Sequence, residues 1–110
     1  MDEAAFLEQA EEMLVCIEDL IGRAIDEQDL DLDLELQAGG ILKLEFDNGS
    51  QIIINKHAAA REIWIAARSG GFHFRPEGDD WIGTRDGRPL LAVLEEAMTQ
   101  QAGKPVVLAR

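Results

Sequence analysis

The chain has 110 residues, a length that fits a single domain over residues 1–110, and its formal net charge of −12 disfavours direct binding to nucleic acid, whose phosphates it would repel. Its apolar runs are far shorter than the roughly 20 residues that span a bilayer, and the acidic N-terminus lacks the basic start of a signal peptide. We therefore expect a cytoplasmic protein with no membrane segment. The single cysteine, Cys16, excludes an internal disulfide, and no Cys/His cluster offers a soft-metal site.

The acidic side chains are concentrated at the start of the chain. Of the 22 acidic and 10 basic residues, 13 acidic residues and one basic residue, Arg23, lie in residues 1–35, which leaves nine of each kind in residues 36–110. The whole charge imbalance therefore belongs to the first third of the chain. Cations or a basic protein surface are the natural partners of such a segment.

Residues 3–24 are predicted to form an amphipathic helix, because apolar side chains recur at spacings of three and four. The apolar stripe contains Phe6, Ala10, Met13, Leu14, Ile17, Ile21 and Ala24. At about 100° per residue, acidic side chains lie opposite that stripe or on its flank. They are Glu8, Glu11, Glu12, Glu18 and Asp19.

Leucine and acidic residues then alternate, which predicts a strand despite the poor strand propensity of both residue types. Its predicted core side consists of Leu30, Leu32, Leu34 and Leu36, and its other side of Asp29, Asp31, Asp33 and Glu35. Further strands are expected at 41–46, 51–55, 62–68, 72–74 and around Trp81, and the Asn48-Gly49 pair suits a hairpin with positive φ.

Pro89 is predicted to begin a second helix, and Gly103 to end it in the left-handed conformation. Its buried stripe would contain Leu90, Leu91, Leu94, Ala97, Met98 and Gln101, and residues 106–110 would form a tail that packs on the core. The order helix, strands, helix predicts an α+β fold: a two-layer α/β sandwich with two helices packed on one face of an antiparallel sheet.

Strand alternation also predicts which side chains lie on the open face of the sheet. If Ile63 and Ile65 point to the helices, then Trp64 points away from them, as does His73 between inward Phe72 and Phe74. Tryptophan on an exposed face is a candidate anchor for a partner.

The acidic surface has two interpretations that the residue pattern leaves open. One is a solvated face that maintains solubility. The other is a shallow site for hard or borderline cations, which prefer oxygen ligands. An EF-hand is excluded, because position 6 of the loop that would begin at Asp29 is Leu34 rather than glycine and position 12 is Gly40 rather than glutamate. Same-side carboxylates on a strand lie about 7 Å apart, so binding should be weak and shared among several ions.

Catalysis has little support in the sequence. His57 and His73 are far apart in the sequence, which disfavours a dedicated histidine metal site, and Cys16 has no basic neighbour at helical spacing that would favour its thiolate. No nucleophile elbow, P-loop or dinucleotide-binding motif occurs. We therefore predict no catalytic residues.

Four segments closely resemble, in order, segments of the frataxin family. They are FDNGSQIIINK (Phe46 to Lys56), EIWIAARSGGFHF (Glu62 to Phe74), GDDWIGTRDG (Gly78 to Gly87) and LLAVLEEAMTQQAG (Leu90 to Gly103). The acidic helix and first strand occupy the places of the family's acidic ridge, so the resemblance covers nearly the whole chain.

The resemblance implies a frataxin-like sandwich that binds iron weakly, as Fe²⁺ or Fe³⁺ and with other divalent cations as possible ligands, and that regulates iron–sulfur cluster assembly. Its implied partners are a cysteine desulfurase and the iron–sulfur scaffold protein. The implied metal ligands are Glu11, Glu18, Asp19, Asp26, Asp29, Asp31 and Asp33. The implied partner-binding residues are Asn55, Trp64, Glu18 and Asp19. The sequence departs from the bacterial pattern at Gly22 and Arg23, where the helix end is usually acidic.

We expect a monomer in the absence of iron. Two alternatives remain: an acidic protein-interaction module without physiological iron binding, and, by family analogy, an iron-oxidising enzyme, although the sequence has no preorganised redox site.

Overall fold

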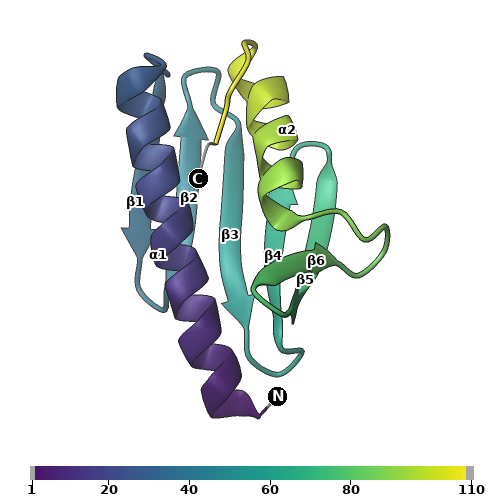
Figure 1. Cartoon of the computed structure of the whole chain (residues 1–110). Helices are drawn as coiled ribbons and strands as arrows, with labels where there is room; N and C mark the ends of the chain where they lie inside the picture. The colour runs from purple at the N-terminus through teal and green to yellow at the C-terminus, as the bar shows by residue number, and fades with distance from the viewer. Residues whose placement is uncertain (1, 109–110) are drawn as a thin grey trace.

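The computed structural model describes residues 2–108, which form two helices and a six-stranded antiparallel sheet in the strand order β1-β2-β3-β4-β5-β6 (Figure 1). The elements are α1 (Glu3–Glu27), β1 (Leu32–Gln37), β2 (Ile41–Phe46), β3 (Gln51–His57), β4 (Glu62–Ala67), β5 (Gly70–Glu77), β6 (Asp80–Gly83) and α2 (Leu90–Ala102). Both helices lie on the same face of the sheet. The predicted two-layer α/β sandwich is therefore confirmed.

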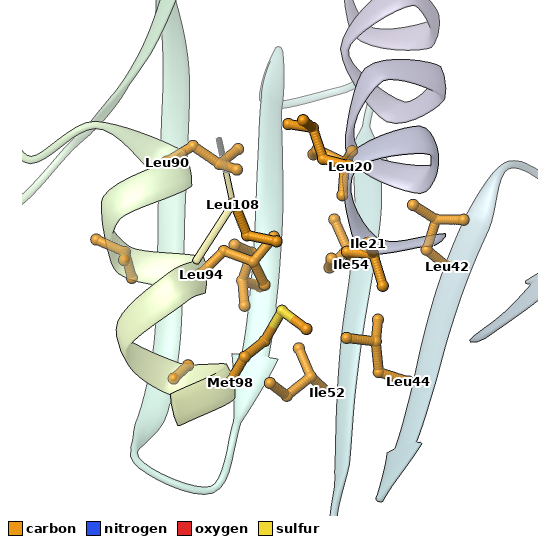
Figure 2. Close-up of a cluster of buried hydrophobic side chains, with 14 of the residues drawn as sticks. Leu20, Ile21, Leu42, Leu44, Ile52, Ile54, Leu90, Leu94, Met98 and Leu108 are labelled. Atoms are coloured by element: carbon orange, nitrogen blue, oxygen red, sulfur yellow. The ribbon is translucent and has the colours of Figure 1, made fainter. Parts of the chain in front are cut away.

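The core lies between the helices and the middle strands, as Figure 2 shows. Leu44 on β2 lies across from Ile52 on β3, and both side chains are fully buried. Leu20 and Ile21 enter the same core from α1, and Leu90, Leu94 and Met98 enter it from α2. Strand alternation behaves as predicted, since Ile63 and Ile65 on β4 are buried as well. The residues that alternate with these buried positions point to the opposite face of the sheet. Within residues 2–108 no helix covers that face.

The first helix is longer than the apolar pattern predicts and runs to Glu27 rather than to residue 24. It begins at Asp2, whose carboxylate accepts the N–H of Ala5 at 2.8 Å. At its other end, the side chain of Gln28 donates to the carbonyl of Val107 at 2.7 Å and accepts the N–H of the same residue at 2.9 Å. The C-terminal segment thus stabilises the last turn of α1, through contacts that the helical periodicity of the sequence does not predict.

The first strand is shorter than predicted. It begins at Leu32, because Asp29 has a left-handed backbone (φ 52°) and the N–H of Leu30 bonds back to the carbonyl of Ile25. Leu30 and Leu32 are buried as predicted, but Leu36 is 60% exposed. The prediction that all four leucines join the core was wrong, because β1 is an edge strand and its last leucine is not covered by α1.

The β2–β3 hairpin uses its asparagine differently from the prediction. Only Gly49 has positive φ, whereas Asn48 does not. The Asn48 side chain accepts the N–H of Ser50 at 2.9 Å and donates to the carbonyl of Gln101 at 2.8 Å. The hairpin is therefore tied to α2.

Gln101 is buried in the α2 stripe as predicted, but its role there is polar. Its Oε1 accepts the N–H of Arg68 at 3.0 Å, and its Nε2 donates to Ser50 Oγ at 3.0 Å and to the Gln51 carbonyl at 3.1 Å. One side chain thus joins α2 to the turns beside β3 and β4. Such a buried amide stabilises only while its partners remain.

The chain end packs on the core, as predicted for residues 106–108. Val106 and Leu108 are buried, and Figure 2 shows Leu108 beside Leu94 and Ile54. Residues 109–110 lie outside the described part of the chain.

Gly22 lies inside α1, where glycine costs helix stability. A Cβ built there meets nothing within 4 Å and the backbone is helical. We expect Gly22→Ala to raise the free energy of unfolding by about 0.5–1 kcal/mol in urea titrations. Gly39→Ala is the matched control: it also has free space, but its φ of +86° is strained for alanine, so it should lower stability. A loss of stability in Gly22→Ala would contradict this account.

Candidate metal-binding and docking surfaces

The seven residues implied as metal ligands are called here the acidic ridge, and they lie on α1, on β1 and on the connection between them. Glu11, Glu18, Asp19 and Asp26 lie on α1, Asp29 and Asp31 in the connection to the sheet, and Asp33 on the edge strand β1. Six of the seven are exposed and Glu18 is half-buried. In Figure 1, α1 and β1 lie side by side at one edge of the sheet. Because Leu34 lines a groove with α1, its neighbour Asp33 points to the other face of the sheet.

Three ridge residues line one groove between α1 and β1. Glu18, Asp19 and Asp26 share this groove of about 540 Å³ with Leu34 and Arg23. Arg23 Nη2 lies 3.1 Å from Asp19 Oδ2, so one carboxylate of the groove is already paired with a cation. Such an exposed pair contributes little to stability and can exchange with a bound cation.

The ridge is not a closed metal site. Among the described residues, no group of three His, Cys, Asp or Glu side chains converges on a common point. Asp31 and Asp33 project from the β1 side of the ridge, about 7 Å apart along the chain. An ion here would have one or two carboxylate ligands and otherwise water, which is the arrangement of a weak and reversible site.

The edge of the ridge contains a like-charge pair. Asp33 on β1 lies directly across from Glu45 on β2, and both side chains are exposed. Like charges directly opposite on neighbouring strands destabilise a sheet by about 0.2–1 kcal/mol. Glu45 is partly compensated, because its Oε2 lies 3.9 Å from Lys43 Nζ and accepts a hydrogen bond from Gln51 Nε2 at 3.1 Å.

A second groove, called here the apolar groove, adjoins the ridge at its other end. It has a volume of about 400 Å³, and Val15 and Leu36 within it are 65% and 60% exposed. Glu11 and Glu18 border it. This groove was not predicted from the sequence, because the alternation of leucine and acid predicts Leu36 in the core.

Lys56 also borders the apolar groove. Its Nζ lies 3.6 Å from Glu11 Oε1 and passes over Gly40, where a Cβ would approach within 2.9 Å of the ammonium. Gly40 also has a φ of +74°, so the turn itself favours glycine there, whereas the flexible end of Lys56 could move to accommodate a Cβ.

Asn55 and Trp64 lie on the opposite, open face of the sheet, as predicted. They are cross-strand neighbours, and His73 follows on the other side of Trp64. Trp64 is less accessible than predicted, because its ring is stacked between His57 at 4.0 Å and His73 at 4.3 Å. Two histidines that are distant in sequence are thus brought to the same tryptophan, which the strand register could have revealed.

The four implied partner-binding residues therefore occupy two surfaces. Glu18 and Asp19 lie on α1, on the helical side of the sheet, whereas Asn55 and Trp64 are on the open face. A single partner that contacts all four would have to reach around the β1 edge.

The sequence and fold are similar to those of known proteins. Residues 1–104 match the model of the frataxin-like domain. The chain is 49% identical over 109 residues to the iron-sulfur cluster assembly protein CyaY of Janthinobacterium sp. (strain Marseille), covering 98% of this chain and 96% of that protein. It is 46% identical over 108 residues to the CyaY of Dechloromonas aromatica, covering 98% and 99%.

Two solved structures have the same fold. Frataxin from Psychromonas ingrahamii matches over 100% of both chains, with a TM-score of 0.82 and 28% identity. Trimeric frataxin from the yeast Saccharomyces cerevisiae, complexed with ferrous, matches over 87% of both chains, with a TM-score of 0.74 and 26% identity. Neither helix in the described part of this chain is long and apolar enough to cross a membrane.

Proposed function

The chain belongs to the frataxin family, and from this premise we propose that it is a non-catalytic, cytoplasmic regulator of iron–sulfur cluster assembly. It binds Fe²⁺ or Fe³⁺ weakly along the acidic ridge and docks on a cysteine desulfurase and its scaffold protein. The curated relatives carry the name of iron–sulfur cluster assembly proteins, and the ridge has the chemistry such a role needs.

The observation that carries this proposal is the groove lined by Glu18, Asp19 and Asp26, with Arg23 beside them. Solubility alone does not require three carboxylates in one groove, since acids elsewhere on the surface would serve as well. A cation or a basic surface placed against this groove reduces the repulsion among the carboxylates, so the binding of either is coupled to it.

The ligand chemistry supports a labile site. Exposed carboxylates with water in the remaining positions bind iron but release it readily, unlike a closed Cys/His cage. Asp19 is already paired with Arg23, so iron must compete for that carboxylate. We expect affinity to depend on several ridge residues in small increments and not on one.

The apolar groove favours the second candidate, an acidic interaction module without physiological iron binding. Exposed Val15 and Leu36, bordered by Glu11 and Glu18, resemble a protein-docking surface more than an ion site. Both candidates predict docking, and they differ in whether iron changes it.

A pull-down with a bacterial cysteine desulfurase, with and without Fe²⁺ under anaerobic conditions, tests the proposal. We expect retention on the immobilised desulfurase that changes when Fe²⁺ is added, because the ion and the partner use the same carboxylates. Equal retention with and without Fe²⁺ would support the interaction module. No retention in either condition would contradict docking altogether.

A further inference from the structure

The open face of the sheet contains an aromatic stack whose polar atoms the proposed function does not use. It consists of His57 on β3, Trp64 on β4 and His73 on β5, neighbouring strands in Figure 1. The rings are nearly parallel, at 9° between His57 and Trp64 and 8° between Trp64 and His73. The tryptophan therefore fixes the plane of each imidazole.

Glu62 is the one carboxylate built into this stack. Its side chain is only 19% exposed, and its Oε1 accepts the indole N–H of Trp64 at 2.7 Å. The same Oε1 lies 3.5 Å from His73 Nδ1, which is longer than an ordinary hydrogen bond. A carboxylate oxygen and an imidazole nitrogen are thus held side by side, each oriented by Trp64.

That separation suits a shared metal ion. Bonds of about 2.1 Å from an imidazole nitrogen and a carboxylate oxygen to one ion, at an angle of about 110°, place the two donors about 3.5 Å apart. The indole N–H on Glu62 is the kind of outer hydrogen bond that orients metal-binding carboxylates. The carboxylate oxygen has a second lone pair available for the ion.

The other histidine is arranged differently. His57 Nδ1 accepts the backbone N–H of Ala60 at 3.3 Å, and the carboxylate of Glu62 is hydrogen-bonded to the indole N–H and faces His73. The two ends of the stack therefore have different chemistry, and only the His73 end pairs nitrogen with oxygen.

We propose that Glu62 and His73 form an open two-ligand site for a divalent transition-metal ion, separate from the acidic ridge. The imidazole favours borderline ions such as Fe²⁺, Co²⁺, Ni²⁺ and Zn²⁺ over Mg²⁺ and Ca²⁺, which prefer oxygen alone. The remaining coordination positions face outward on the surface that also carries Asn55, where a ligand from a docked protein can complete them. Arg75, the next outward residue of β5, adds a positive charge to the same face, which opposes cation binding.

Co²⁺ is the probe, added to ¹⁵N-labelled protein in the presence of excess Mg²⁺, which occupies the oxygen-only ridge. Paramagnetic broadening of the Trp64 indole N–H resonance reports binding, and the indole of buried Trp81 is the internal reference. We expect Glu62→Gln and His73→Gln each to raise the Co²⁺ concentration for half-broadening by about tenfold or more.

His57→Gln is the matched control, because it removes an imidazole from the same indole while leaving the Glu62–His73 pair in place. In this variant the Trp64 indole resonance should broaden at the same Co²⁺ concentration as in the unmodified protein. The spectra of all three variants should confirm folding. The proposal is overturned if Trp64 does not broaden, if Mg²⁺ abolishes the broadening, or if the three variants respond alike.

Discussion

The double variant Asp31→Lys, Asp33→Lys is expected to lose desulfurase binding by on the order of 100-fold, about 2.7 kcal/mol, and to bind iron more weakly. It places two positive charges at the β1 side of the acidic ridge, where a basic partner or a cation would approach. Asp29 is left unchanged, because its left-handed backbone (φ 52°) would add strain with a lysine side chain. Binding is measured by titration calorimetry with the desulfurase and, separately, with Fe²⁺.

The design separates lost binding from lost folding. Asp33→Lys places a lysine instead of an aspartate across from Glu45 in the strand register, so the variant should be at least as stable as the unmodified chain. The control is Asp79→Lys, Asp80→Lys, which changes the net charge by the same amount at the exposed β5–β6 turn. Equal losses in both variants would contradict a role for the ridge, and loss of desulfurase binding with iron affinity intact would favour the interaction module.

Gln101→Leu is expected to lower the free energy of unfolding by about 3 kcal/mol. The leucine fits the apolar side of α2 but leaves the N–H of Arg68 and the carbonyl of Gln51 without the partner they have now. Thermal and urea unfolding measure the effect, which corresponds to a decrease in Tm of roughly 13 °C for a domain of this size.

Gln100→Leu is the control, since it makes the same change one residue earlier, on the exposed side of α2. It should alter stability by no more than about 0.5 kcal/mol. If Gln101→Leu unfolds at the same temperature and urea concentration as Gln100→Leu and the unmodified protein, then the buried amide network does not contribute to stability.

The sequence predicted the fold well where one residue pattern determined one element. The helix stripe from Phe6 to Ala24 and the buried Ile63 and Ile65 are confirmed, because an amphipathic period fixes which side faces the core. Propensity alone would have missed β1, whose leucines and aspartates are poor strand formers, and here the alternation was the stronger signal.

Local sequence patterns did not predict the features that depend on contacts between residues far apart in the sequence. The last turn of α1 depends on Gln28 pairing with Val107, 79 residues away. Leu36 alternates correctly but is exposed, since alternation gives the side of a sheet and not the extent of the helix that covers it. Gln101 was correctly placed on the buried side, but nothing in the helix period identified its polar partners across the fold.

The functional surfaces also differ in whether a local sequence pattern predicts them. The acidic ridge was visible in the sequence because its charges lie in one contiguous segment, residues 1–35. The stack of His57, Trp64 and His73 was not, because it depends on the pairing register of three strands. The two histidines are far apart in the sequence, and only the strand register brings them to the same tryptophan.

An anaerobic Fe²⁺ titration of ¹⁵N-labelled protein tests the central claim most directly. If the acidic ridge holds iron, the backbone resonances of residues 8–35 broaden or shift first, at lower Fe²⁺ concentrations than those of α2 and the β5–β6 turn. If the resonances of residues 8–35 stay unchanged while others respond, the ridge is not the iron site.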